Sequence, residues 1–126
     1  MPIEHHVDSA YRAYVVTVYG TFSQEDVLHS VNARYADQEY KPGMYILLDL
    51  TDADGKSLTR HPDEEYRALA DASRARHQDD NVLLVVAPSD IAYGLARMNQ
   101  NWFADTREVH VFRSLTEAHS HIRGEA

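Results

Sequence analysis

Residues 44–51 read MYILLDLT, an apolar run of strand length that ends abruptly in a polar and acidic segment. The side chains at this end include Asp49, Thr51, Asp52 and Asp54. In α/β folds, ligands and switch residues lie where such strands end. We therefore expect this strand to be central in the sheet, and its polar end to be the working edge of the domain.

Short apolar segments recur on both sides of that run. We predict strands at residues 3–7, 13–19, 44–50, 82–87 and 108–112. The segment 82–87, VLLVVA, has no polar alternation, which indicates a strand buried on both faces of a parallel sheet. Residues 8–12 have the length of a hairpin connection, so the first two strands should be antiparallel.

Helical patterns separate most of these strands. Their expected first residues are Ser23, Pro62, Ser89 or Asp90, and Ser114, the last of which begins a capping box with Glu117. The order is β-β-α-β-α-β-α-β-α. It predicts an α/β fold, a single domain over 1–126 with a mixed sheet of about five strands, about four helices and right-handed crossovers.

The apolar spacing also predicts which helix faces point inward. For the first helix the expected stripe is Val27, Leu28, Val31 and Tyr35. For the third helix it is Ile91, Leu95, Met98 and Trp102, broadened by Ala92, Ala96 and Phe103, with Tyr93 and Arg97 on a neighbouring face. In the closing helix it is Leu115, Ala118 and Ile122. Gly94 disfavours a helix, which indicates close approach of another backbone, a side chain or a ligand there.

Composition excludes several classes of function. The 126 residues carry a formal net charge of -8, which disfavours nucleic acid as a partner. The chain has no cysteine, so disulfides and thiolate chemistry are excluded. The apolar runs are too short for membrane insertion, and residues 1–6 lack the pattern of a secretion signal, so we expect a cytoplasmic protein.

Catalytic and metal motifs fail on their spacing. Residues 55–57, GKS, resemble the end of a phosphate-binding loop, but Leu50 stands where that loop needs a glycine. An EF-hand would likewise need a carboxylate at Leu50. The eight histidines include the close pairs His5–His6 and His119–His121, whose spacing makes poor chelates on regular elements. We therefore expect no enzyme activity, no cofactor and no metal site.

Three segments carry a family resemblance: LDLT at 48–51, YGLARM at 93–98 and VFRSLTEA at 111–118. With the order of elements, they resemble the STAS-like group, which includes the SpoIIAA-type anti-sigma-factor antagonists and small stand-alone proteins of unknown role. The likeness covers nearly the whole chain, and its motifs are mostly packing and turn signatures. It implies a STAS-like fold and a non-enzymatic regulatory or binding module.

In this family a serine or threonine near the start of the helix after the central strand is phosphorylated to control partner binding. Here the corresponding register, counted from Asp49, falls at Leu58, and Ser57 and Thr59 flank it. The resemblance makes these two residues candidate switch sites, together with the loop-edge residues Asp49, Thr51, Asp52 and Asp54.

Two functions stay open. In the first, the module binds a protein partner or a second copy of itself through the 51–59 loop and the exposed fringe of the third helix. In the second, it binds a small apolar ligand or lipid beside that helix, since STAS-like folds also resemble the CRAL-TRIO fold. The candidate partner or pocket surface is the same in both: Tyr93, Arg97, Met98 and Trp102.

Overall fold

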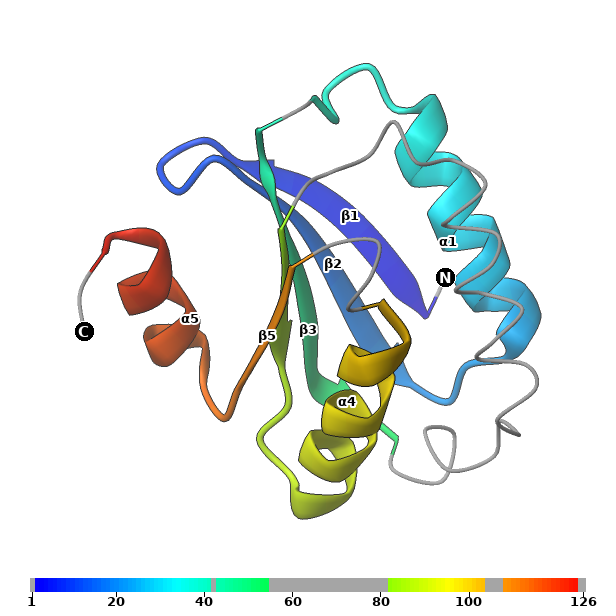
Figure 1. Ribbon diagram of the computed structural model, residues 1–126. Helices are drawn as coiled ribbons and strands as arrows, with labels where there is room; N and C mark the ends of the chain where they lie inside the picture. Colours follow the sequence, from blue (N-terminus) through cyan, green and yellow to red (C-terminus); the bar gives the residue numbers. More distant parts are fainter. Residues whose placement is uncertain (1, 42, 55–81, 104–107, 125–126) are drawn as a thin grey trace.

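The computed structural model describes residues 2–41, 43–54, 82–103 and 108–124 (Figure 1). The described strands are β1 (Ile3–Asp8), β2 (Ala13–Gly20), β3 (Tyr45–Ala53), β4 (Leu83–Val86) and β5 (Val109–Phe112). The described helices are α1 (Gln24–Ala36), α4 (Asp90–Phe103) and α5 (Leu115–Ile122). The helix predicted to begin at Pro62 lies outside the described residues. None of the helices in the described ranges is long and apolar enough to cross a membrane.

The five strands form one mixed sheet in the order β1-β2-β3-β4-β5. The hairpin β1–β2 is antiparallel, and each later strand pairs in parallel with the one before it. The predicted α/β fold, the five strands and the initial antiparallel hairpin are therefore confirmed. The strands lie in the sheet in the same order as in the chain. When the connections between successive parallel strands all have the same handedness, their helices therefore lie on the same face of the sheet.

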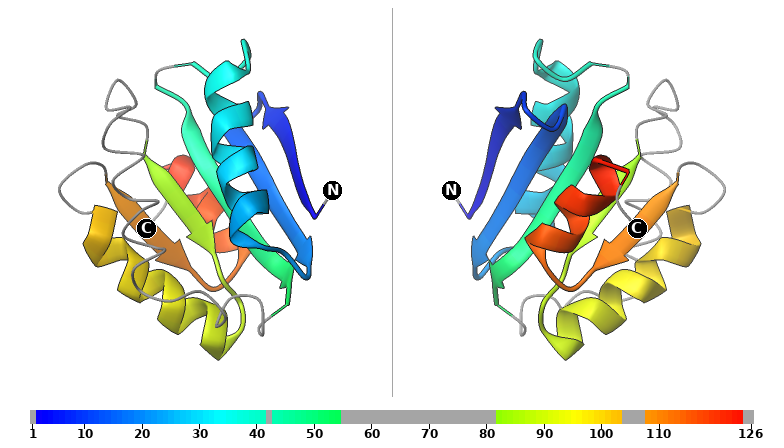
Figure 2. Two further views of the ribbon diagram at one scale, coloured as in Figure 1. Left: turned by 90° about the vertical axis from the view of Figure 1, so that its right-hand side faces the viewer. Right: turned by 90° about the vertical axis from the view of Figure 1, so that its left-hand side faces the viewer.

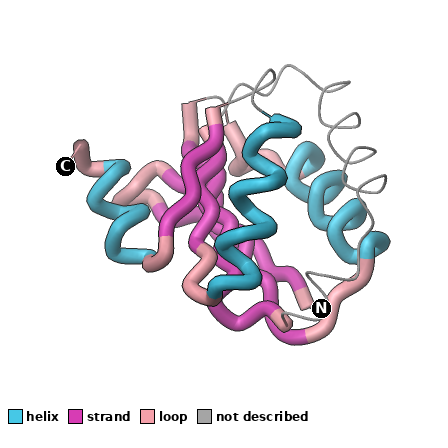
Figure 3. The backbone as a smooth tube through the Cα atoms, turned by 60° about the horizontal axis from the view of Figure 1, so that its bottom comes forward, coloured by secondary structure: helices cyan, strands magenta, loops and turns pink. Residues whose placement is uncertain are grey.

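The helices cover the two faces unequally (Figure 2). Helices α1 and α4, from the connections between strands, lie on one face, and α5, which follows the last strand, lies on the other. The tube in Figure 3 shows α5 set apart from the other two helices by the sheet. Each face has its own apolar core, one beneath α1 and α4 around Tyr14, Ile46 and Val85, the other beneath α5 around Leu47 and Leu84.

Strand β3 is longer than its apolar run. It continues to Ala53, because Tyr19 and Gly20 at the end of β2 pair with Asp52 and Ala53 after an irregularity at which β3 has one residue more than β2. Thr51 and Asp52, expected in a loop, are thus held in a strand.

Helix α1 begins as predicted and turns a different face inward. Ser23 accepts from the Asp26 amide, and the Asp26 carboxylate accepts from the Ser23 amide, which makes a capping box. Val27 packs on the core, but Leu28 is exposed, and the polar Ser30 and Arg34 are buried. The predicted apolar stripe was wrong at Leu28. Ser30 is turned inward by its hydrogen bond to His5 of β1, and the guanidinium of Arg34 lies over the rings of Tyr35 and Tyr40.

Helix α4 begins at Asp90, with the Ser89 hydroxyl accepting from the amide of Ala92. The predicted stripe was wrong at Ile91, which is 53% exposed. Ala92 and Ala96, which were predicted to broaden that stripe, are buried against the sheet as expected, because small side chains allow the helix backbone to lie close to the strands. Gly94 serves no close approach among the described residues, since a Cβ there would meet no atom within 4 Å.

Helix α5 has half of its predicted capping box. The Ser114 hydroxyl accepts from the Glu117 amide, but the Glu117 carboxylate accepts from the amide of Arg113. Ala118 is buried and Ile122 packs beside it, whereas Leu115 is exposed, so this part of the predicted stripe was wrong. Gly124 follows the helix with φ +77°, the left-handed conformation in which glycine commonly ends a helix.

Candidate functional site

The carboxyl ends of β2, β3, β4 and β5 meet at one edge of the sheet, at the bottom of Figure 1. We call this surface the carboxyl edge. Its side chains lie near the carboxyl ends of β2 and β3, directly follow β2, β3 or β5, or begin α4: Tyr19, Thr21, Asp49, Thr51, Asp52, Asp54, Asp90, Tyr93 and Arg113. Glu4 of β1, which pairs with Thr17, lies beside them. All four predicted loop-edge residues of the described chain are among them.

The side chain of Asp49 is hydrogen-bonded to Thr51. Asp49 Oδ1 accepts from the backbone amide of Thr51 at 3.0 Å and from its hydroxyl at 2.6 Å. This local bonding fixes the orientation of the Asp49 carboxylate and engages the Thr51 hydroxyl. The pair therefore presents negative charge in a defined position.

Asp54 ties the end of β3 to the chain that follows β2. Its amide donates to the Gly20 carbonyl at 2.9 Å, and the Thr21 hydroxyl donates to Asp54 Oδ2 at 3.4 Å. These bonds join the carboxyl ends of two neighbouring strands. The candidate switch residues Ser57 and Thr59, a few positions further on, lie outside the described residues.

Carboxylates gather around Tyr19. Partial loss of solvent, then the charge and hydrogen bond of Glu4, then Asp52 and Asp49, raise the pKa of the Tyr19 hydroxyl. All of these charged neighbours act in the same direction, because each disfavours a phenolate nearby. The surface around Tyr19 is therefore electronegative.

The other side of the carboxyl edge holds Arg113, which follows β5. Its Nη1 donates to Asp90 Oδ1 at 2.7 Å, and its guanidinium lies 4.1 Å from the ring centre of Tyr93. A third bond runs to the Pro88 carbonyl at 3.4 Å. Tyr93 was predicted as a surface residue, but its partner Arg113 was missed, because no spacing in the sequence relates the two.

The remaining predicted surface residues are not brought to this cluster by any described contact. Arg97 is exposed on α4. Met98 and Trp102 belong to the same helix, and their side chains lie outside the described residues.

A second polar cluster lies between the sheet and α1, and the sequence analysis did not find it. Tyr14, which is fully buried, donates from its hydroxyl to Asp37 Oδ2 at 2.7 Å. Since the hydroxyl has one proton, it accepts from His5 Nδ1 at 3.0 Å. The other ring nitrogen of a neutral His5 then accepts from the Ser30 hydroxyl at 2.6 Å. The result is a directed chain of hydrogen bonds from Ser30 to Asp37.

The pKa shifts agree with this arrangement. Burial and, next, the charge of Arg34 lower the pKa of His5, which keeps the ring neutral. The backbone amide of Glu39 and then the Tyr14 hydroxyl lower the pKa of Asp37. Burial and the hydrogen bond to Asp37 raise the pKa of Tyr14. The network is therefore stable with Asp37 ionised, Tyr14 protonated and His5 neutral.

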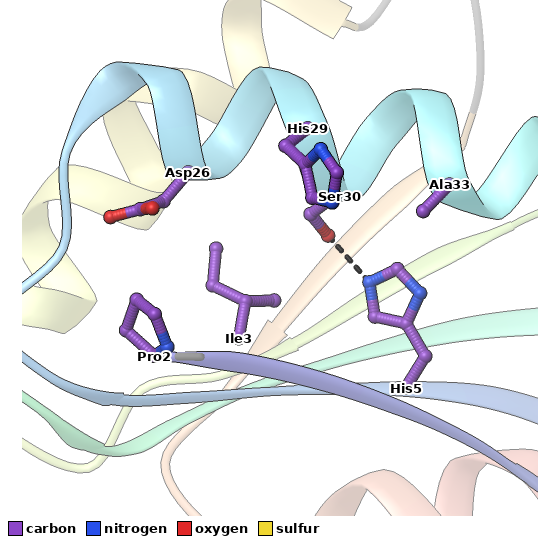
Figure 4. Close-up of a pocket in the computed structure, with 7 residues that line it drawn as sticks. All are labelled: Pro2, Ile3, His5, Asp26, His29, Ser30 and Ala33. Atoms are coloured by element: carbon purple, nitrogen blue, oxygen red, sulfur yellow. Dashed lines mark hydrogen bonds between the residues drawn. The ribbon is translucent and has the colours of Figure 1, made fainter.

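Beside this network is a small hollow of about 100 Å³ between β1 and α1 (Figure 4). It is lined by Pro2, Ile3, His5, Asp26, His29, Ser30 and Ala33. A volume of this size holds about three water molecules at roughly 30 Å³ each. Drug-sized ligands occupy about 300–1,000 Å³, so this hollow is suited to water or a very small polar molecule.

A third cluster joins Glu108 and His110 with His121 of α5, and their candidate ligand atoms all lie within 4.8 Å of one another. The sequence analysis compared only histidines close together in the chain. The cluster depends on α5 folding back over β5, which local spacing does not show.

These features define the class of the protein as a small α/β domain with a five-stranded mixed sheet. No family model matches the chain, and no curated protein matches it with significance.

Proposed function

We propose that this protein is a non-enzymatic, STAS-like interaction module that binds a partner protein through the carboxyl edge. The observation that carries the proposal is the gathering of Glu4, Asp49 and Asp52 around Tyr19. An electronegative surface favours a partner with a complementary basic surface.

The local bonding at this edge supports a role in recognition. Asp49 is oriented by Thr51, and Asp54 is joined to the chain after β2, so the charges stand on a rigid sheet end. Rigid placement lowers the entropy lost on binding. The positive charge of Arg113 is balanced by Asp90 and does not cancel the neighbouring carboxylates.

Charge also favours a different protein over a second copy of this chain. The net charge is -8, and two carboxyl edges facing each other would bring like charges together. We therefore propose a basic protein partner. Self-association would be detected by the same experiment, as cross-links to a second copy of the chain. The apolar-ligand alternative beside α4 stays a prediction, because it depends on Met98 and Trp102.

The test is zero-length carbodiimide cross-linking, which joins carboxylates to lysine amines in direct contact. The protein is cross-linked in extract of its own cells, and the joined peptides are sequenced by mass spectrometry. We expect joined peptides that contain Glu4, Asp49, Asp52 or Asp54 and a lysine of another protein.

A matched pair of variants sharpens the experiment. The double variant E4Q/D52N removes two exposed carboxylates at the edge, and E25Q/E39Q removes two exposed carboxylates elsewhere. The first should lose the partner and the second should keep it. Equal retention by both variants, or cross-links from edge carboxylates only to a second copy of this chain, would overturn the proposal.

A further inference from the structure

The cluster of Glu108, His110 and His121 lies at the amino end of β5. Glu108 directly precedes the strand, and His110 is two residues further on. Side chains two apart in extended chain point to the same face, so both point toward α5. His121 comes from α5, which covers that face, and the ring centres of His110 and His121 are 4.4 Å apart.

The donor atoms are already close. Glu108 Oε2 lies 2.7 Å from His110 Nε2, and one ligand atom from each residue lies within 4.8 Å of the other two. Zinc bonds of about 2.0–2.2 Å in a tetrahedron place the donors about 3.4 Å apart. Small side-chain rotations are therefore enough to bring the three atoms to one ion, without movement of the strand or helix.

The surroundings combine an apolar wall with access to solvent. The ring of Phe112 lies 6.4 Å from that of His110 and 5.4 Å from that of His121. The side chains of Glu108 and His110 are 63% and 35% exposed. An ion can thus enter from solvent, and a water molecule can complete its coordination.

We propose that Glu108, His110 and His121 form a binding site for a divalent cation of the zinc class, with water as the fourth ligand. Two imidazoles and one carboxylate suit Zn²⁺, Ni²⁺ or Co²⁺, whereas Mg²⁺ and Ca²⁺ prefer oxygen ligands. His110 binds through Nε2, so the ring carries its proton on Nδ1 and Glu108 turns from the imidazole to the ion.

This inference stands apart from the proposed function. The site lies at the amino end of β5, whereas Arg113 of the carboxyl edge follows the other end. Loss of one site does not require loss of the other, and the cross-linking experiment does not report on metal binding.

The chain supplies a close control. His119 is two residues before His121 on the same helix, but its ring stacks on Tyr11 at 3.8 Å and takes no part in the cluster. The variants H121Q and H119Q remove the same group from neighbouring positions. E108Q tests the carboxylate at an exposed position, where the fold does not depend on it.

The experiment titrates the full chain, without a polyhistidine tag, with Zn²⁺ in a calorimeter and with Co²⁺ by visible absorption. We expect one ion per chain in the parent and in H119Q, and affinity lower by about tenfold or more in H110Q, H121Q and E108Q. Circular dichroism confirms the fold of each variant. Ca²⁺ should not compete.

Three results would overturn the proposal. They are a failure to bind one ion per chain, an unchanged affinity for Zn²⁺ in folded H121Q and E108Q, and a loss of affinity in H119Q as large as that in H121Q. Thermal melting provides an independent measurement. Zn²⁺ should raise the melting temperature of the parent and of H119Q but not of H121Q, because a ligand stabilises only the state that binds it.

Discussion

The hydroxyl of Tyr14, in β2, donates to the carboxylate of Asp37, the residue that ends α1, over 2.7 Å. This bond joins β2, the second strand of the sheet, to the carboxyl end of α1. His5 and Ser30 extend it to β1 and to the middle of α1. Three elements are thus connected by polar contacts within an otherwise apolar layer.

The variant Y14F should be less stable than the parent by about 1–3 kcal/mol in urea unfolding, because it leaves a buried nitrogen of His5 and the Asp37 carboxylate without their shared partner. The control is Y11F, which removes an exposed hydroxyl that accepts from Arg123. Its effect should be within about 0.5 kcal/mol. Equal losses in the two variants would contradict this role of Tyr14.

The lowered pKa of His5 predicts a pH dependence of stability. The unfolded chain protonates His5 near its ordinary value of 6.5, and the folded chain only at lower pH. Between these values the unfolded state binds more protons, so the free energy of unfolding falls as the pH drops below about 6.5. When the pH is lowered from 7.5 to 5.5, the free energy of unfolding measured in urea should fall less in H5Q than in the parent. The neighbouring H6Q, exposed on the same strand, should behave like the parent.

The inward face of α4 can be tested by two adjacent substitutions. Ala92 is buried against the sheet, so A92L should cost about 1–3 kcal/mol through overpacking. Ile91 is largely exposed, so I91A should change stability by about 0.5 kcal/mol or less. Thermal or urea unfolding separates these results. A larger loss in I91A than in A92L would show that Ile91, and not Ala92, packs against the sheet.

Two glycine-to-alanine changes should have opposite signs. Gly94 lies in α4 with open space at its Cβ position, so G94A should stabilise the protein by about 1 kcal/mol. Gly20 also has open space, but its φ is +53°, a conformation that costs an L-residue about 1–2 kcal/mol. G20A should therefore destabilise. A loss in G94A, measured by thermal unfolding, would show that this position does serve a close approach.

Most strands were predictable because they are short, dense apolar runs, and β1 because Ile3, His5 and Val7 alternate along it. The segment 82–87 was correctly assigned to a buried position. The helix faces were less predictable. Apolar periodicity correctly placed Ala92 inward, but it also favoured Leu28 and Ile91, which are exposed. It missed the buried Ser30, because a hydrogen-bond partner on the sheet outweighs side-chain hydrophobicity there.

The candidate sites also include residues that local sequence could place and contacts that it could not. Asp49, Thr51, Asp52 and Asp54 lie at the end of a recognisable strand, so their common edge could be predicted. The pairing of Tyr93 with Arg113, the chain from Ser30 to Asp37 and the approach of His121 to His110 depend on tertiary contacts between distant segments. Nothing in local spacing encodes such distances.

The order of strands in the sheet matches the order in which a ribosome makes them. The hairpin β1–β2 can pair as soon as it emerges, and β3, β4 and β5 each add to an edge already present. Until its neighbour is made, each new edge offers unpaired backbone groups beside apolar side chains such as Ile46 and Leu47. A chain stalled after β3 would therefore expose an apolar, unpaired edge and be prone to aggregation until β4 pairs with it.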